Sequence, residues 1–200
     1  MREQDFAPVL QVLQNNPKGV VLADPGGESY PFLVTIFTEH DLYWLPAAIT
    51  SAVPIEHPKE ALLVYLFVNR DSRADPVAYL NTVLASTAAN AYTEIYEELE
   101  AYHSGIPMQN YWRTPSPHTS PVILAARASY LPQVGTEYKA RANSREKVRP
   151  ILRARDVKYV LWDMRRNPEW DLAALGPMTL IATSTDIKLY ELTPPPSTSE

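Results

Sequence analysis

One predicted turn contains residues that could bind a ligand: Asp24-Pro25-Gly26-Gly27-Glu28-Ser29. It follows an apolar run and precedes a segment with helical spacing. In α/β proteins this is where glycine-rich loops bind phosphates, because N–H groups at a helix start attract anions. The turn matches neither G-x-G-x-x-G nor G-x-x-x-x-G-K-[ST], and the Glu28 carboxylate would repel a phosphate. The ordinary interpretation is a tight turn in which Glu28 or Ser29 caps the next helix.

If a small ligand binds, the carboxyl end of the strand before this turn is where we expect it, since ligands of open α/β sheets bind there. The candidate ligand-binding residues are Asp24, Gly26, Gly27, Glu28, Ser29, Tyr30, His40 and Trp44. No residue in this set forms a recognised catalytic signature, so we assign no catalytic residue.

The histidines, serines and missing cysteines give little support to metal or nucleophilic chemistry. No two of the four histidines have the spacing of metal ligands on a helix, and HExxH does not occur. The absence of cysteine excludes disulfides, thiolate zinc sites and cysteine nucleophiles. No G-x-S-x-G elbow occurs, which argues against a hydrolase of that kind. We therefore expect neither a metal nor a cofactor.

Three tryptophans have tyrosines or acidic residues beside them, as sugar-stacking platforms do. Trp44 follows Tyr43, Trp112 follows Tyr111, and Trp170 lies between two acids. Aromatic faces near carboxylates suit carbohydrate, but buried aromatic side chains in a core give the same pattern. Both interpretations stay open.

The composition sets limits on partners and compartment. The chain of 200 residues has a net charge of −5 without a basic block, which argues against nucleic acid and anionic membrane surfaces. The longest clean apolar run, residues 61–68, is far shorter than the roughly 20 residues that cross a bilayer. The polar start, residues 1–16, has no apolar segment typical of a signal peptide.

The first part of the chain predicts a strand–helix–strand unit. Residues 19–24 indicate a buried strand, 30–38 a short helix and 41–45 a second strand, after a first helix over 5–15. The helix predicted over residues 59–69 is apolar nearly all round, so it lies inside the domain or meets a partner.

The rest of the chain predicts long helices and then a hairpin. Apolar steps of three and four indicate one long helix over residues 76–103, capped by Asp75, with its glutamates facing away or flanking the stripe. Residues 121–132 are ambiguous between strand and helix, and 145–155 indicate a helix. Residues 157–162 indicate a strand, while 178–183 and 187–192 indicate a β-hairpin.

Together these elements predict an α/β fold with a mostly parallel, Rossmann-like central sheet, a C-terminal antiparallel hairpin and long inserted helices. We expect a single domain over residues 1–193. The proline- and serine-rich residues 194–200 have nothing to bury and are expected to form a disordered tail.

Three phrases carry a resemblance to a known family: GVVLADP…SYPFLVTIFTEHDLYW, EALLVYLFVNR and LRARDVKYVLWD…NPEW…LGPMTLIATSTDIKLYEL. They resemble the soluble C-terminal domain of multi-spanning bacterial and archaeal membrane proteins of the GT-C glycosyltransferase type, over residues 17–192. The resemblance implies a domain outside the cytoplasmic membrane, next to a membrane portion that uses lipid-linked sugars. The family's catalytic acids lie in that membrane portion, so none is carried over to this chain.

Two functions of different classes follow, beside a third interpretation as a purely structural module that mediates homo-oligomers. The first is a non-catalytic extracytoplasmic accessory domain of a glycosyltransferase-like membrane protein, which positions substrate or contacts a partner. Its partners would be the membrane-embedded portion and a carbohydrate or lipid-linked sugar, without nucleic acid. The alternative is a free-standing Rossmann-like protein or enzyme, cytoplasmic in this case, that binds a small molecule or nucleotide with the turn from Asp24 to Ser29.

Overall fold

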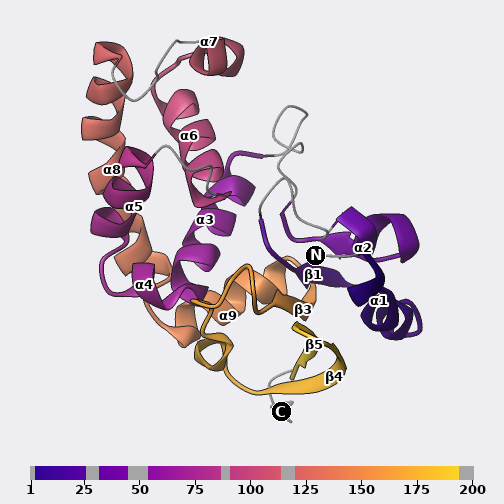
Figure 1. The fold of residues 1–200 in the computed structure, drawn as a ribbon. Coiled ribbons are helices and arrows are strands. Elements are labelled where there is room, and N and C mark those ends of the chain that lie inside the picture. The colour runs from indigo at the N-terminus through magenta and orange to yellow at the C-terminus, as the bar shows by residue number, and fades with distance from the viewer. Residues whose placement is uncertain (1–2, 26–31, 45–53, 87–90, 114–119, 194–200) are drawn as a thin grey trace.

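The computed structural model describes residues 3–25, 32–44, 54–86, 91–113 and 120–193. It has an α/β fold (Figure 1). The sheet is mixed, and its strand order is β2-β1-β3-β5-β4. Helices cover both faces of the sheet, and further helices form a layer beside it. The expected tail, residues 194–200, lies outside the described residues.

The sheet is parallel on one side and antiparallel on the other. β1 (Val20–Leu22) pairs in parallel with β2 (Asp41–Leu42) and with β3 (Val157–Asp163). β5 (Ile187–Leu192) pairs antiparallel with β3 and with β4 (Met178–Ser184). The hairpin is thus confirmed, but the sheet is only partly parallel because the hairpin adds both antiparallel pairings.

Each face of the sheet has its own apolar core. The η1 turn (Glu3–Asp5), α1 (Ala7–Gln14) and α2 (Phe32–Phe37) lie at one face, where Leu10, Leu13 and Val34 pack against β1, β3 and β5. On the other face lie α3 (Glu56–Val68), α9 (Arg145–Ala154) and η4 (Leu172–Leu175). The alternating side chains of β3 supply both cores: Val160 faces α3, and Tyr159 and Leu161 face α1.

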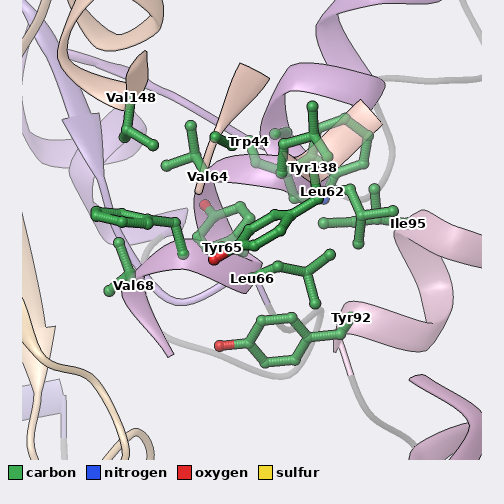
Figure 2. Close-up of a cluster of buried hydrophobic side chains, with 14 of the residues drawn as sticks. Trp44, Leu62, Val64, Tyr65, Leu66, Val68, Tyr92, Ile95, Tyr138 and Val148 are labelled. Carbon is green, nitrogen blue, oxygen red and sulfur yellow. The ribbon is translucent and has the colours of Figure 1, made fainter. Parts of the chain in front are cut away.

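Helix α3 lies at the centre of the molecule, and every side chain from Ala61 to Val68 is buried. Figure 2 shows Leu62, Val64, Tyr65 and Leu66 of this helix among side chains from several other elements, including Tyr92 and Ile95 of α6. The apolar surface of α3 is therefore satisfied within the chain. The interpretation of this helix as a partner-docking surface is wrong, and the core interpretation is confirmed.

The segment predicted as one helix over residues 76–103 forms two, α5 (Pro76–Ala85) and α6 (Ala91–His103). Asp75 caps α5 as expected, since its side chain accepts a hydrogen bond from the N–H of Ala78 at 2.9 Å. Helix α5 ends because Ser86 takes an extended conformation, with φ −78° and ψ 146°. Serine and threonine compete with the helical backbone for hydrogen bonds, a local effect that apolar spacing does not reveal.

The glutamates of α6 also differ from expectation. Glu98 and Glu100 are 6% and 0% exposed, because the helix is enclosed by α3, α7 (Met108–Arg113) and α8 (Pro121–Arg141). Tyr102, placed in the apolar stripe by its spacing, is 61% exposed. The ambiguous segment after residue 120 is helical and belongs to α8.

Helices α5 and α8 approach each other closely at Gly135. A Cβ atom at this position would lie 2.6 Å from Cγ2 of Val77, so a larger residue would push the two helices apart. The short helix α4 (Arg70–Arg73) joins α3 to this layer, and its N-cap is the buried side chain of Asn69. No helix within the described ranges is long and apolar enough to span a membrane.

Candidate functional site

The carboxyl ends of the three parallel strands meet at one edge of the sheet. After β1 the chain passes through α2 to β2 on one side of β1, and it later returns to β3 on the other side. The connections cover opposite faces of the sheet, so β1 and β3 flank a topological switch point. In open α/β sheets a crevice at this place is the usual binding site.

An ion pair joins the two strand ends at the switch point. Asp24 follows β1 by two residues, and its Oδ2 lies 3.0 Å from Nε of Arg166, in the turn after β3. The Asp24 side chain is 10% exposed and that of Arg166 is 35% exposed. The pair thus places a carboxylate and a guanidinium side by side at the edge of the sheet.

The two carboxylate oxygens of Asp163, the last residue of β3, differ in their hydrogen bonds to the described residues. Its Oδ1 accepts hydrogen bonds from the N–H groups of Arg165 and Arg166, at 3.0 Å and 3.3 Å. Its Oδ2 is buried without a hydrogen-bond partner among the described residues. Burial raises the pKa of Asp163, and the nearby Asp24 carboxylate raises it further, against the lowering effect of the two backbone donors.

Two further polar residues complete this edge. The Nδ2 of Asn167 is also buried and has no hydrogen-bond partner in the part of the chain that the structure describes. The backbone of Asn167 is fixed, because its carbonyl accepts a hydrogen bond from Nε1 of Trp162 at 2.8 Å. Burial raises the pKa of Glu169, to which Asp24 adds a repulsive contribution. Buried polar atoms without partners are rare in native proteins, and two of them lie within five residues here.

Aromatic side chains of the apolar core pack next to the carboxyl end of β1. The hydroxyl of Tyr65, from the central helix α3, donates to the carbonyl of Ala23 at 2.9 Å, directly before Asp24. The Tyr65 ring packs against Trp170 and Tyr43, with ring centroids 6.1 Å and 6.2 Å apart. Nε1 of Trp170 donates to the hydroxyl of Tyr92 at 3.0 Å. These contacts hold the end of β1 rigidly, as a preorganised site requires.

Of the candidate residues from the sequence, the structure places Asp24 at this edge. Gly26, Gly27, Glu28, Ser29 and Tyr30 lie outside the described residues.

His40 lies at the opposite, amino end of the sheet, where its ring nitrogens contact backbone atoms of Gly19 and Leu13. Trp44 follows β2 but is only 5% exposed and belongs to the apolar core. The structure therefore does not bring His40 together with Asp24, and it gives Trp44 a packing role.

The tryptophans do not form an exposed sugar platform in the described structure. Trp170 is 3% exposed and Trp44 is 5% exposed, so neither offers a free ring face; of the Trp112 side chain nothing is described. Within the described ranges, no three acids or histidines are placed to hold a metal ion.

Sequence reasoning missed Asp163, Arg166 and Asn167. The signal was present in the phrase VLWD, in which an acidic residue ends a strongly predicted strand. Its importance depends on β3 lying parallel to β1 and next to it. That pairing joins segments more than 130 residues apart, and the local pattern does not contain it.

Two hollows lie elsewhere on the molecule. One, of about 440 Å³, lies between α1 and α2 and is lined by Leu10, Leu33 and Phe37 among others. The other, of about 290 Å³, lies between α9 and the neighbouring ends of β3 and β5.

Comparison with known proteins gives no further guide to this site. No protein family, curated protein or solved structure matches the chain.

The polar groups at this end of the sheet are suited to binding a ligand through hydrogen bonds. A carboxylate, a guanidinium and a carboxamide bind hydroxyl and amide groups through directed hydrogen bonds. Asp163 offers a free acceptor and Asn167 a free donor, again with respect to the described residues. A ligand with neighbouring hydroxyl groups has the matching chemistry for both, and because both atoms are buried it reaches them only when the turn after β3 moves.

Proposed function

We propose that the chain is a non-catalytic accessory domain that binds a hydroxyl-rich group, such as a sugar, at the switch point between β1 and β3. The observation that carries the proposal is the buried Oδ2 of Asp163, which has no hydrogen-bond partner among the described residues and lies beside the Asp24–Arg166 pair. A buried acceptor without a partner costs free energy, which a ligand hydroxyl would recover.

The role in a larger assembly rests on the resemblance. In this proposal the domain lies on the extracytoplasmic side of a membrane and positions a lipid-linked sugar for a glycosyltransferase-like membrane portion. We propose binding and not catalysis at this site, because Arg166 already neutralises Asp24 and two backbone donors occupy one oxygen of Asp163. Such committed carboxylates orient a substrate better than they transfer its protons.

The direct test is a calorimetric titration of the full chain with monosaccharides and with a short-chain polyprenyl-phosphate sugar. Asp163→Asn keeps an oxygen for the backbone donors but replaces the free acceptor by an amide donor or disturbs the turn, so sugar affinity should fall about tenfold or more. Asp186→Asn is the matched control, because it removes the same charge from the carboxylate that pairs with Arg165. Equal losses in both variants would reject the site.

A second test concerns the assembly. The DNA that precedes the Met1 codon can be read for apolar segments of about 20 residues, in frame or in an adjacent gene. Such segments support the accessory role, and an unrelated neighbourhood removes its main support.

The alternative is a Rossmann-like protein that binds a nucleotide at the same edge. It is favoured by the switch point itself and by the glycine turn that follows Asp24. The same titration separates the two functions: saturable binding of a nucleotide, without binding of sugars, supports the alternative and contradicts the accessory role.

A further inference from the structure

Three arginines form a stripe along α9, at the end of the sheet opposite the candidate site. Arg145, Arg149 and Arg153 are spaced four residues apart and therefore lie on one side of the helix. The inward side is formed by Val148 and Leu152, which are 0% and 1% exposed. The stripe thus runs beside the buried side of α9, along the seam between the helix and the sheet.

The stripe is electrostatically unfavourable within the isolated chain. Burial lowers the pKa of Arg149, and the charges of Arg153 and Arg145 lower it further. Like charges four residues apart destabilise a helix. Within the described ranges, neither Arg149 nor Arg153 forms an ion pair with a carboxylate, whereas Arg155 on the same segment pairs with Glu60 at 2.7 Å.

The middle arginine is held in place. The guanidinium of Arg149 donates through Nη2 to the carbonyl of Thr193, directly after β5. The stem of Arg145 packs on Gly176, where an added Cβ would lie 2.8 Å from the arginine Cδ. Fixed guanidinium groups lose less conformational entropy on binding than free ones, so they favour recognition of a ligand.

A hollow of about 290 Å³ adjoins this stripe. Arg149 and Arg153 line it from α9, Lys158 from β3 and Glu191 from β5. Asp156 also lines it, but its carboxylate lies 3.4 Å from Nζ of Lys158. The hollow is therefore a concave place with two guanidinium groups that have no carboxylate partner in the described structure.

We infer that this hollow binds the phosphate group of a small phosphate ester or of an anionic lipid headgroup. The planar guanidinium fork matches the oxygens of a phosphate, which accept two parallel N–H···O bonds from one arginine. A bound phosphate would also reduce the repulsion between Arg149 and Arg153, the two arginines of the stripe that line the hollow. The volume is near the lower end for small-molecule sites, which suits a headgroup or a phosphorylated small molecule.

The site is independent of the proposed sugar site. It lies where β3 begins and β5 ends, whereas Asp163 lies at the other end of β3. Asp163→Asn should therefore leave phosphate binding unchanged, so the two proposals can fail separately.

Calorimetry with inorganic phosphate and cosedimentation with vesicles test the inference on the full chain. We expect saturable phosphate binding that weakens with salt, and an affinity at least about tenfold lower in Arg149→Gln/Arg153→Gln. Arg149→Lys/Arg153→Lys keeps the positive charges but loses the guanidinium forks, so its phosphate affinity should lie between those of wild type and the double glutamine variant. Arg70→Gln/Arg113→Gln is the matched control, since it removes two charges from exposed arginines elsewhere and should bind within about twofold of wild type.

Glu191 provides a test in the opposite direction. Its carboxylate lines the hollow and repels an anion, so Glu191→Gln should tighten phosphate binding, while Glu146→Gln on the exposed side of α9 should change it less. A gain in affinity is not produced by misfolding, which keeps the inference testable even if the double variant is unstable.

The vesicle experiment distinguishes a lipid headgroup from a soluble phosphate ester as the source of the phosphate. Cosedimentation with phosphatidylglycerol vesicles, absent with phosphatidylcholine and lost in the double glutamine variant, assigns the site to lipid headgroups. Phosphate binding without vesicle binding assigns it to soluble phosphate esters. Binding of neither probe, or an equal loss in the Arg70/Arg113 control, overturns the inference.

Discussion

Asp24 and Arg166 lie 142 positions apart in the sequence, yet the carboxylate Oδ2 of the first lies 3.0 Å from Nε of the second. The pair joins the ends of β1 and β3 at the switch point of the sheet. The pairing of β1 with β3 brings the two strand ends together, and the ion pair joins their side chains.

Arg166→Gln should weaken this edge. Because Asp24 is 10% exposed, its carboxylate depends more on the guanidinium than a surface carboxylate would, and we expect the free energy of unfolding to fall by about 1 kcal/mol. Urea denaturation measures the loss. Arg70→Gln, which breaks an exposed pair with Asp71, is the control and should have a smaller effect. Equal losses in the two variants would show that the Asp24–Arg166 pair contributes no more to stability than an exposed pair does.

His40 should prove structural. Its Nε2 lies 2.9 Å from the Leu13 carbonyl and its Nδ1 lies 3.3 Å from the Gly19 N–H, so the ring joins α1 to the start of β1. His40→Leu leaves these two backbone groups without that partner, and we expect a loss of about 2 kcal/mol in unfolding free energy.

The same variant also tests the location of the ligand site. Since His40 lies at the amino end of the sheet, His40→Leu should leave sugar binding unchanged under conditions where the protein stays folded. A calorimetric titration checks this. Loss of binding in a folded variant would mean that the ligand lies at the amino end, far from Asp163.

Residues with strong local signals were predicted well. The β-branched and aromatic run of β3, the hairpin of β4 and β5, and the Asp75-Pro76 start of α5 all form as expected, because pleat and cap geometry depend on neighbouring residues. The site residues were predicted poorly. Asp163 matters only through its position next to β1, and strand order is a long-range property.

The apolar stripe over residues 76–103 shows a second limit. The apolar residues Leu80 and Leu84 of α5 and Ile95 and Leu99 of α6 are all buried, as their spacing predicts. The prediction of one continuous helix through them was wrong, because they belong to two helices. Apolar spacing records which residues face the core. It does not record a change of backbone direction at Ser86 between two helices that bury the same side.

Glu98 should make stability depend on pH. Burial raises its pKa to about 8, with a smaller contribution from Glu94, and its Oε2 has no hydrogen-bond partner among the described residues. A folded-state pKa above the unfolded value gives stability that is fully present below the unfolded pKa and lost as the pH rises through the folded pKa. The fold should therefore lose stability between about pH 4.5 and pH 8.

Glu98→Gln removes this dependence. The variant should match wild type at pH 5 and exceed it by about 2 kcal/mol in unfolding free energy at pH 9, because only the charged carboxylate is penalised by burial. Urea denaturation at the two pH values measures both. Glu94→Gln should change the profile less, since Glu94 is exposed and only the secondary cause. An unchanged pH profile in Glu98→Gln would contradict the assignment.

Arg127 should be required to keep Glu100 buried as a charge. Glu100 is 0% exposed, and its oxygens accept hydrogen bonds from the hydroxyls of Tyr96 and Tyr111, at 3.0 Å and 2.7 Å, and from Arg127 at 3.3 Å and 3.4 Å. Arg127→Met removes the one positive charge among these donors. We expect a loss of about 3 kcal/mol in unfolding free energy, the usual result of breaking a buried ion pair from one side.

A double-mutant cycle separates the pair from its surroundings. Glu100→Gln/Arg127→Met should be more stable than Arg127→Met alone, because a neutral glutamine needs no counter-charge and can still accept from the two tyrosines. Urea denaturation of the four proteins in the cycle gives the coupling energy. If the two single losses simply add, Arg127 acts through its packing between α6 and α8, and the charge of Glu100 is held by the tyrosine hydroxyls alone.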